Sequence, residues 1–234
     1  MLSQPAASLT DLVLGVVTLA LALGTRSLDV HRYWRRTLWW AAASALAGAV
    51  HHGFVTDSKT WAGPSWAVIS GIVVMTISFS LAASVHDVLG PGRRKVFWLL
   101  RSASAGAYAG FAAFGYYGVG TILACEGVTM LTIIVLWGIA LRRGHPRAPA
   151  MLLALSASAA AGCVRALPAD ITEVVRLDPI SLYHLAQIPG MILLYMALIN
   201  APALPGNLRW IRVSDSGEVA GPIGRLDAER SDFQ

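Results

Sequence analysis

Histidines and carboxylates placed in or beside apolar stretches are the residues of this sequence best suited to chemistry. They are His51, His52, Asp57, Glu126 and His184. Zinc takes neutral imidazole nitrogens and carboxylate oxygens, and a catalytic zinc keeps one position for a water whose pKa falls towards 7. A nearby carboxylate can accept the proton of that water. These residue types therefore favour a metal-assisted hydrolytic site.

Structural interpretations of the same residues stay open beside the chemical one. A histidine at a membrane interface is often a solvated or hydrogen-bonded side chain. Glu126 can be protonated and hydrogen-bonded to a neighbouring helix, although a carboxylate inside a membrane span is costly and often functional. Cys125 and Cys163 lie in apolar segments without a CxxC pair, so neither a zinc finger nor a disulfide framework is implied.

Composition places these residues in a membrane protein. The chain has 234 residues, of which 56% are hydrophobic and 13% charged, and its mean hydropathy is +0.59. Soluble domains carry about 25% charged residues, so lipid must solvate much of this surface. The formal charge of +5 comes from short loops between apolar runs. No basic face forms, and nucleic acid is excluded as a partner.

Seven apolar segments are long enough to cross a bilayer. A spanning helix needs about 20 mostly apolar residues, and its backbone must satisfy its own hydrogen bonds. The segments lie at 9–25, 37–55, 64–86, 97–116, 119–141, 149–166 and 180–200. The sequence therefore predicts an all-α polytopic membrane protein, a seven-transmembrane-helix domain over residues 1–203. Residues 204–234, rich in Gly, Pro and mixed charge, are predicted to form a disordered cytoplasmic tail.

Basic residues predict the orientation of these segments. Of the 18 Lys and Arg residues, 15 fall in the odd-numbered loops, their helix ends and the tail, which leaves only Lys59, Arg165 and Arg176 on the other side. Cytoplasmic loops carry the excess of Lys and Arg. The N-terminus is therefore predicted outside and the C-terminus in the cytoplasm of a multi-pass cell-membrane protein.

This orientation brings the candidate residues to one depth. His51 and His52 end the second segment at its outer side, and Asp57 lies in the adjoining outer loop. Glu126 lies about two turns into the fifth segment and His184 about one turn into the seventh, both from the outside. Four separate stretches therefore supply groups to one predicted outer site. His86 and Asp87 lie at the opposite end and cannot join it.

The architecture across residues 9–200 resembles the superfamily of seven-span membrane hydrolases that includes the alkaline ceramidases and the progestin and adipoQ receptors. The stretch Gly48–Phe54 contains a span-two histidine, Tyr183–Gln187 contains a span-seven histidine, and Asp57 matches an aspartate of the pattern. The resemblance implies a zinc site. The family's second span-seven histidine would fall on Ile188, and its serine on Ala47 or Gly48. Either His51, His52 or Glu126 therefore supplies a substitute ligand here, or the chain is a divergent branch without the metal.

Two functions from different classes follow. The first is a zinc-dependent hydrolase of a lipid amide or ester, in which His52 and His184 bind the metal. His51 or Glu126 completes the metal shell, and Asp57 acts as base or orients the water. The second is a non-enzymatic sensor or carrier in the lipid membrane, with a metal-free polar site around Glu126 and His184. No pattern in the sequence specifies an oligomeric state.

Two other classes of membrane protein have recognisable requirements in the sequence. A retinal-binding pump needs a lysine in the last span, and this segment has none. A haem carrier needs paired histidines on facing helices, and His51 or His52 opposite His184 would supply such a pair.

Overall fold

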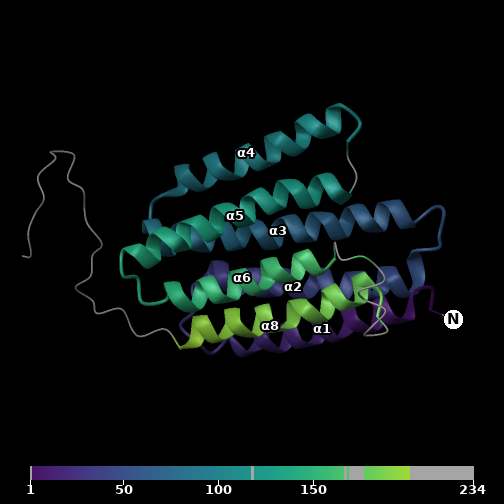
Figure 1. Ribbon diagram of the computed structural model, residues 1–234, viewed down its shortest axis with the longest axis horizontal. Helices are drawn as coiled ribbons and strands as arrows, with labels where there is room; N and C mark the ends of the chain where they lie inside the picture. The colour runs from purple at the N-terminus through teal and green to yellow at the C-terminus, as the bar shows by residue number, and fades with distance from the viewer. Residues whose placement is uncertain (1, 117–118, 166–167, 169–176, 201–234) are drawn as a thin grey trace, which may run out of the picture. The chain divides into compact units, whose positions relative to one another are not determined.

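Helices make up the ordered structure of this chain. The computed structural model describes residues 2–116, 119–165, 168 and 177–200, and over these residues it contains helices and no strand (Figure 1). The elements are α1 (Pro5–Gly24), α2 (Arg32–Val50), the π-helical turn η1 (His51–Val55), α3 (Ala62–Leu89), α4 (Arg94–Ala113), α5 (Val119–Arg142), α6 (Ala148–Val164) and α8 (Pro179–Ile199). The predicted all-α class is confirmed. The predicted tail, residues 204–234, lies outside the described residues.

Four of the described helices are long and apolar enough to cross a membrane: α1, α3, α5 (from Gly120 on) and α8. The helix α6 is apolar but shorter. The two others contain several basic residues, α2 in its first turns and α4 at Arg94, Lys95 and Arg101. The chain is therefore a membrane protein by its helices, and the seven-span count stays a prediction.

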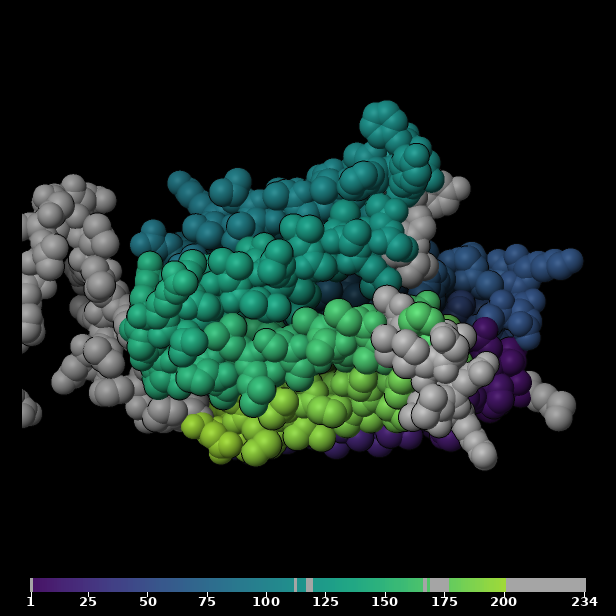
Figure 2. All heavy atoms as spheres, in the orientation of Figure 1, coloured from purple at the N-terminus to yellow at the C-terminus, as the bar shows by residue number. Residues whose placement is uncertain are grey.

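Six helices pack into a closed ring within residues 2–200. The helix α1 packs against α2 and α8, α2 against α3, α3 against α5, α5 against α6, and α6 against α8. The helix α4 stands outside this six-helix ring and packs mainly against α5, as Figure 1 shows at the edge of the bundle. Figure 2 shows α5, α6 and α8 as adjoining bands across one face.

One end of the ring is filled by large side chains. Trp34 and Trp137 are fully buried with ring centroids 6.5 Å apart, and Leu38, Leu81 and Met151 surround them. Each indole finds an acceptor: Trp137 Nε1 donates to Ser84 Oγ (3.0 Å) and Trp34 Nε1 donates to Asp87 Oδ2 (2.8 Å). Van der Waals packing and such hydrogen bonds drive helix association where lipid is as apolar as the side chains. This packed end holds the helices in place and leaves the other end free for a cavity.

Candidate metal centre

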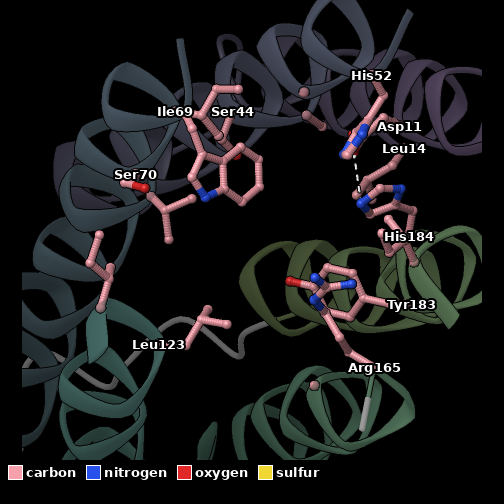
Figure 3. A pocket seen from close by; sticks show the side chains of 17 residues that line it. Asp11, Leu14, Ser44, His52, Ile69, Ser70, Leu123, Arg165, Tyr183 and His184 are labelled. Carbon is pink, nitrogen blue, oxygen red and sulfur yellow. Dashed lines mark ion pairs between the residues drawn. The ribbon is translucent and has the colours of Figure 1, made fainter. Parts of the chain in front are cut away.

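Three buried side chains from three separate elements meet at the other end of the ring. Asp11 comes from the second turn of α1, His52 from η1, and His184 from the second turn of α8 (Figure 3). One ligand atom of each lies within 4.8 Å of the other two. We call these residues the Asp11–His52–His184 cluster. Its burial and composition suit a bound cation.

Local backbone features bring these side chains together. Asp178 caps α8 by accepting hydrogen bonds from the amides of Ile180 (2.9 Å) and Ser181 (3.0 Å), which places His184 on the second turn. Burial raises the pKa of Asp178, but the hydrogen bonds from Ser181 and Ile180 outweigh it and hold that pKa below its ordinary value. A cap of this kind fixes where a helix begins.

At the end of α2, the widened turn η1 carries His52. The amides of Ser3 and Gln4 donate to the carbonyls of Gly53 and His52, each at 3.0 Å, and so tie the N-terminal segment to this turn. π-helical turns are rare and often occur at functional sites. At Gly48, one turn earlier, a Cβ would collide with the Asp11 carboxylate. The absence of a side chain there is what lets α1 and α2 approach at the cluster.

The carboxylate of Asp11 faces both imidazoles. Its Oδ1 lies 3.4 Å from His184 Nε2, and its Oδ2 lies 3.8 Å from His52 Nε2. The two imidazole centroids are 5.8 Å apart. Each histidine therefore presents the same ring nitrogen, Nε2, to the centre of the cluster.

The other ring nitrogens are engaged away from the centre. His52 Nδ1 lies 2.7 Å from Gln4 Oε1, an atom that can only accept, so His52 must donate from Nδ1. The Thr10 hydroxyl donates to a backbone carbonyl of the preceding turn, at Ala6 (2.9 Å) or Ala7 (3.1 Å). Its oxygen then accepts from His184 Nδ1 at 3.3 Å. Such partners fix the tautomer of metal-binding histidines.

A proton or a metal ion must lie where these groups converge. In neutral imidazoles that donate from Nδ1, Nε2 carries a lone pair, so two lone pairs face the oxygens of a carboxyl group. Tetrahedral zinc ligands, each about 2.0–2.1 Å from the metal, are separated by about 3.3 Å. In the cluster the two nitrogen–oxygen separations are 3.4 and 3.8 Å, to different oxygens of Asp11, and one ligand atom of each residue lies within 4.8 Å of the others. The Asp11–His52–His184 cluster can therefore hold a metal ion through one ligand atom of each residue.

A cavity of about 480 Å³ opens beside the cluster. Every helix of the six-helix ring contributes apolar or small residues to it, among them Leu14, Ala45, Ile69, Leu123, Gly162 and Ile180. Ser44, Ser70, Arg165 and Tyr183 add polar groups. Figure 3 shows Arg165 and Tyr183 on the side of the cavity near His184, with Ser70 and Leu123 across from them.

Two of the predicted site residues, His52 and His184, meet in this cluster, and the others lie elsewhere. His51 is buried beside it, but its Nδ1 lies 3.1 Å from Ser65 Oγ and its ring packs against Trp66 with centroids 5.1 Å apart. Asp57 is exposed in the turn after η1. Neither residue belongs to the group whose ligand atoms converge.

Glu126 has a cationic partner that the sequence did not indicate. Arg101 of α4 donates from Nη2 to Glu126 Oε1 (2.8 Å) and from Nη1 to Oε2 (3.0 Å), and both residues are buried. Ser104 Oγ donates to the Cys125 carbonyl beside them (3.1 Å). The carboxylate is thus neutralised at the α4–α5 contact, away from the Asp11–His52–His184 cluster.

Asp11 is the residue that the sequence interpretation missed. It lies inside the predicted first segment, 9–25. Ionisable groups inside membrane spans often mark function, and this rule, which singled out Glu126, applies to Asp11 equally. Its position near the outer end of that segment also matches the predicted depth of His52 and His184. Both signals were present in the sequence.

Comparison with known proteins gives one match. A model for a family of unknown function, DUF6962, matches residues 6–202, a range that contains all three residues of the cluster. No curated protein and no solved structure matches the chain.

Proposed function

The chain belongs to the DUF6962 family, and because that family has no known function, we propose one from the site: a zinc-dependent hydrolase of a membrane lipid amide or ester. The proposal includes the seven-span arrangement with the N-terminus outside. The observation that carries it is the convergence of Asp11 with the Nε2 atoms of His52 and His184 at a largely apolar cavity.

The chemistry of the cluster favours hydrolysis. A zinc ion held by these three residues would polarise an acyl carbonyl and activate a water molecule. Hydrolysis breaks the acyl C–N or C–O bond: the hydroxyl of water goes to the acyl carbon, and its proton goes to the leaving amine or alcohol. Asp11 is the only carboxylate among the described residues that line the cavity. Its two oxygens face different histidines, so one can hold the metal while the other accepts the proton of water.

The rest of the cavity suits a lipid. Its apolar wall can receive an acyl chain, because ligand pockets are mostly apolar with a few polar groups that fix orientation. Tyr183 and Ser70 lie among the polar groups of that wall. Asp57 and Glu126 take no part in this mechanism, since one is exposed and the other is paired with Arg101.

Metal content tests the proposal. Elemental mass spectrometry of the detergent-purified protein should find about one zinc per chain. His184→Ala, His52→Ala and Asp11→Asn should each lose it, because two remaining ligands hold zinc poorly. The matched control is His51→Ala, which removes a buried histidine from the neighbouring position and should keep the metal, since His51 contacts Ser65 instead.

The outcomes separate two functions. Zinc that is lost in the three cluster variants and kept in His51→Ala supports the hydrolase. Hydrolysis of a fluorogenic acyl amide by the protein in nanodiscs then measures turnover. A well-folded wild type without metal would sink the zinc mechanism. A proton shared among Asp11, His52 and His184 would then join the three groups, and the sensor or carrier function, with its site around His184, would take its place.

A further inference from the structure

Arg165 stands beside the cluster without a carboxylate partner among the described residues. It follows the last turn of α6, where it is exposed, and its side chain lines the edge of the same cavity as Asp11, His52 and His184. The ion pairs in the described part of the chain involve other residues. A basic residue at a helix C-terminus is favoured by the helix dipole alone. That effect does not require the guanidinium to face a cavity.

The predicted topology makes an arginine unexpected at this end. It assigns 15 of the 18 basic residues to the cytoplasmic side, which leaves Arg165 among three exceptions. Arginine presents a planar fork of donors that binds carboxylate or phosphate oxygens through two hydrogen bonds. An exposed guanidinium that lines an apolar cavity can bind the anionic group of a ligand whose apolar part enters that cavity.

We propose that the cavity binds a single-chain lipid whose polar part carries a carboxylate or phosphate, and that Arg165 binds this anion. The acyl chain lies against Ile69, Val73 and Leu123 on the opposite wall, and the polar part lies between Arg165 and the cluster. This inference rests on the proposed function, which places the scissile bond next to Asp11. It adds that the substrate is anionic and has one acyl chain.

Cavity size and charge support this ligand class. The cavity of about 480 Å³ is in the lower part of the roughly 300–1,000 Å³ range of small-molecule pockets, which suits one chain better than two. Charge also agrees: with Asp11 neutralised by a bound divalent cation, the cavity carries a net positive charge to which Arg165 contributes. Tyr183 lies on the same side and can donate a further hydrogen bond.

Binding of two matched amphiphiles tests the inference without relying on turnover. Dodecyl phosphate and dodecanol have the same chain and differ in the charge of the head. The wild-type protein in nanodiscs should bind dodecyl phosphate more tightly than dodecanol. Arg165→Gln should weaken binding of the phosphate about tenfold to a hundredfold, the usual effect of losing a charged hydrogen bond, and leave dodecanol unchanged. Arg165→Lys should restore part of the loss.

Two controls make the result specific. Arg143→Gln removes an exposed arginine at the other end of the ring, so it should bind dodecyl phosphate as the wild type does. Inorganic phosphate added at the same concentration should compete poorly, since it lacks the chain. Competition as strong as that of dodecyl phosphate would overturn the lipid assignment in favour of a free anion site.

The remaining outcomes separate this inference from the proposed function. Equal binding of both amphiphiles by the wild type would overturn the inference, and this comparison needs no variant to fold. An equal loss of binding for both amphiphiles in Arg165→Gln would also overturn it. If the wild type contains zinc but shows no preference for the anion, the proposed hydrolase is kept and only the inference of an anionic substrate is lost. Anion preference without zinc keeps the binding site and removes the hydrolase.

Discussion

At Gly48, the helix α2 passes so close to α1 that the space for a Cβ is already filled by the carboxylate of Asp11. A side chain at this position would push Asp11 out of line with His52 and His184. The neighbouring Gly53 has a related role, since a Cβ there would lie 2.8 Å from Ser8 Oγ on α1. Two glycines thus set the distance between the helices that form the cluster.

Gly48→Ala should therefore damage both stability and metal binding. Overpacking a tight contact costs about 1–3 kcal/mol, and the displaced carboxylate no longer completes the three-ligand set. The free energy of unfolding in mixed micelles and the zinc content measure the two effects. Gly71→Ala is the matched control: a Cβ there meets nothing within 4 Å, so the change should stabilise α3 by about 0.5–1 kcal/mol and keep the metal. Full metal content in Gly48→Ala would contradict this account of the close approach.

The residues of the Asp11–His52–His184 cluster were only partly predictable from the sequence. His52 and His184 stood out because imidazoles at one predicted depth suggest a metal site. Asp11 belongs with them only because α1 lies between α2 and α8, a neighbour relation that no periodicity encodes. His51 and His52 are adjacent in sequence, and only the π-helical turn η1 decides which of the two faces the cluster.

At the scale of elements, α4 depends on a polar contact. It lies outside the six-helix ring, and Arg101 and Ser104 are its only buried residues among those described. Both contact α5, through Glu126 and the Cys125 carbonyl. Apolar side chains of α4 such as Leu99 and Phe111 are exposed, as expected of a surface that faces lipid. The buried ion pair is therefore the main polar contact that docks α4, beside Phe97 and Leu100, which pack partly buried against the hydrophobic core.

Glu126→Gln should destabilise the docking of α4 without affecting the metal. Removing one partner of a buried pair leaves an uncompensated charge, at a cost of about 3–5 kcal/mol. Replacing both partners, Arg101→Met with Glu126→Met, should cost less than either single change, because no charge stays unpaired. Free energies of unfolding for the wild type, Arg101→Met, Glu126→Met and the double variant measure the coupling, and the zinc content of Glu126→Gln is the parallel readout. Loss of zinc in Glu126→Gln would place Glu126 at the metal after all.

Helix boundaries were far more predictable than helix contacts. The predicted seventh segment, 180–200, differs from α8 by one residue at each end, because Asp178, Pro179 and a continuous apolar run mark it locally. The pairing of Arg101 with Glu126 was not predictable in this way. Arg101 counts among the 15 basic residues that predict the cytoplasmic side, which indicates no partner for it, and a helix-to-helix contact depends on rotation about the helix axis.

At the scale of the whole molecule, α2 decides how the chain crosses the membrane. The helix α1 is apolar enough to cross a membrane, and α2, with its basic first turns, is not among the helices that are. The 19 residues of α2 nevertheless give it a length of roughly 28 Å, against roughly 30 Å for α1. Asp11 lies near the start of α1 and His52 directly after the end of α2, and the two side chains are in contact. The two helices therefore run side by side in opposite directions, so that if α1 spans the bilayer, α2 must return across it.

Thiol labelling of Lys59→Cys, Arg93→Cys and Arg143→Cys, each in a Cys125→Ala/Cys163→Ala background, tests this topology. Seven spans with the N-terminus outside place position 59 outside and positions 93 and 143 inside. A membrane-impermeant maleimide should then label only the Lys59→Cys variant in intact cells and all three after permeabilisation. If only α1, α3, α5 and α8 spanned, Arg93→Cys alone would be labelled in intact cells. Labelling of both Arg93→Cys and Arg143→Cys would mean seven spans in the opposite orientation, against the bias of the basic residues.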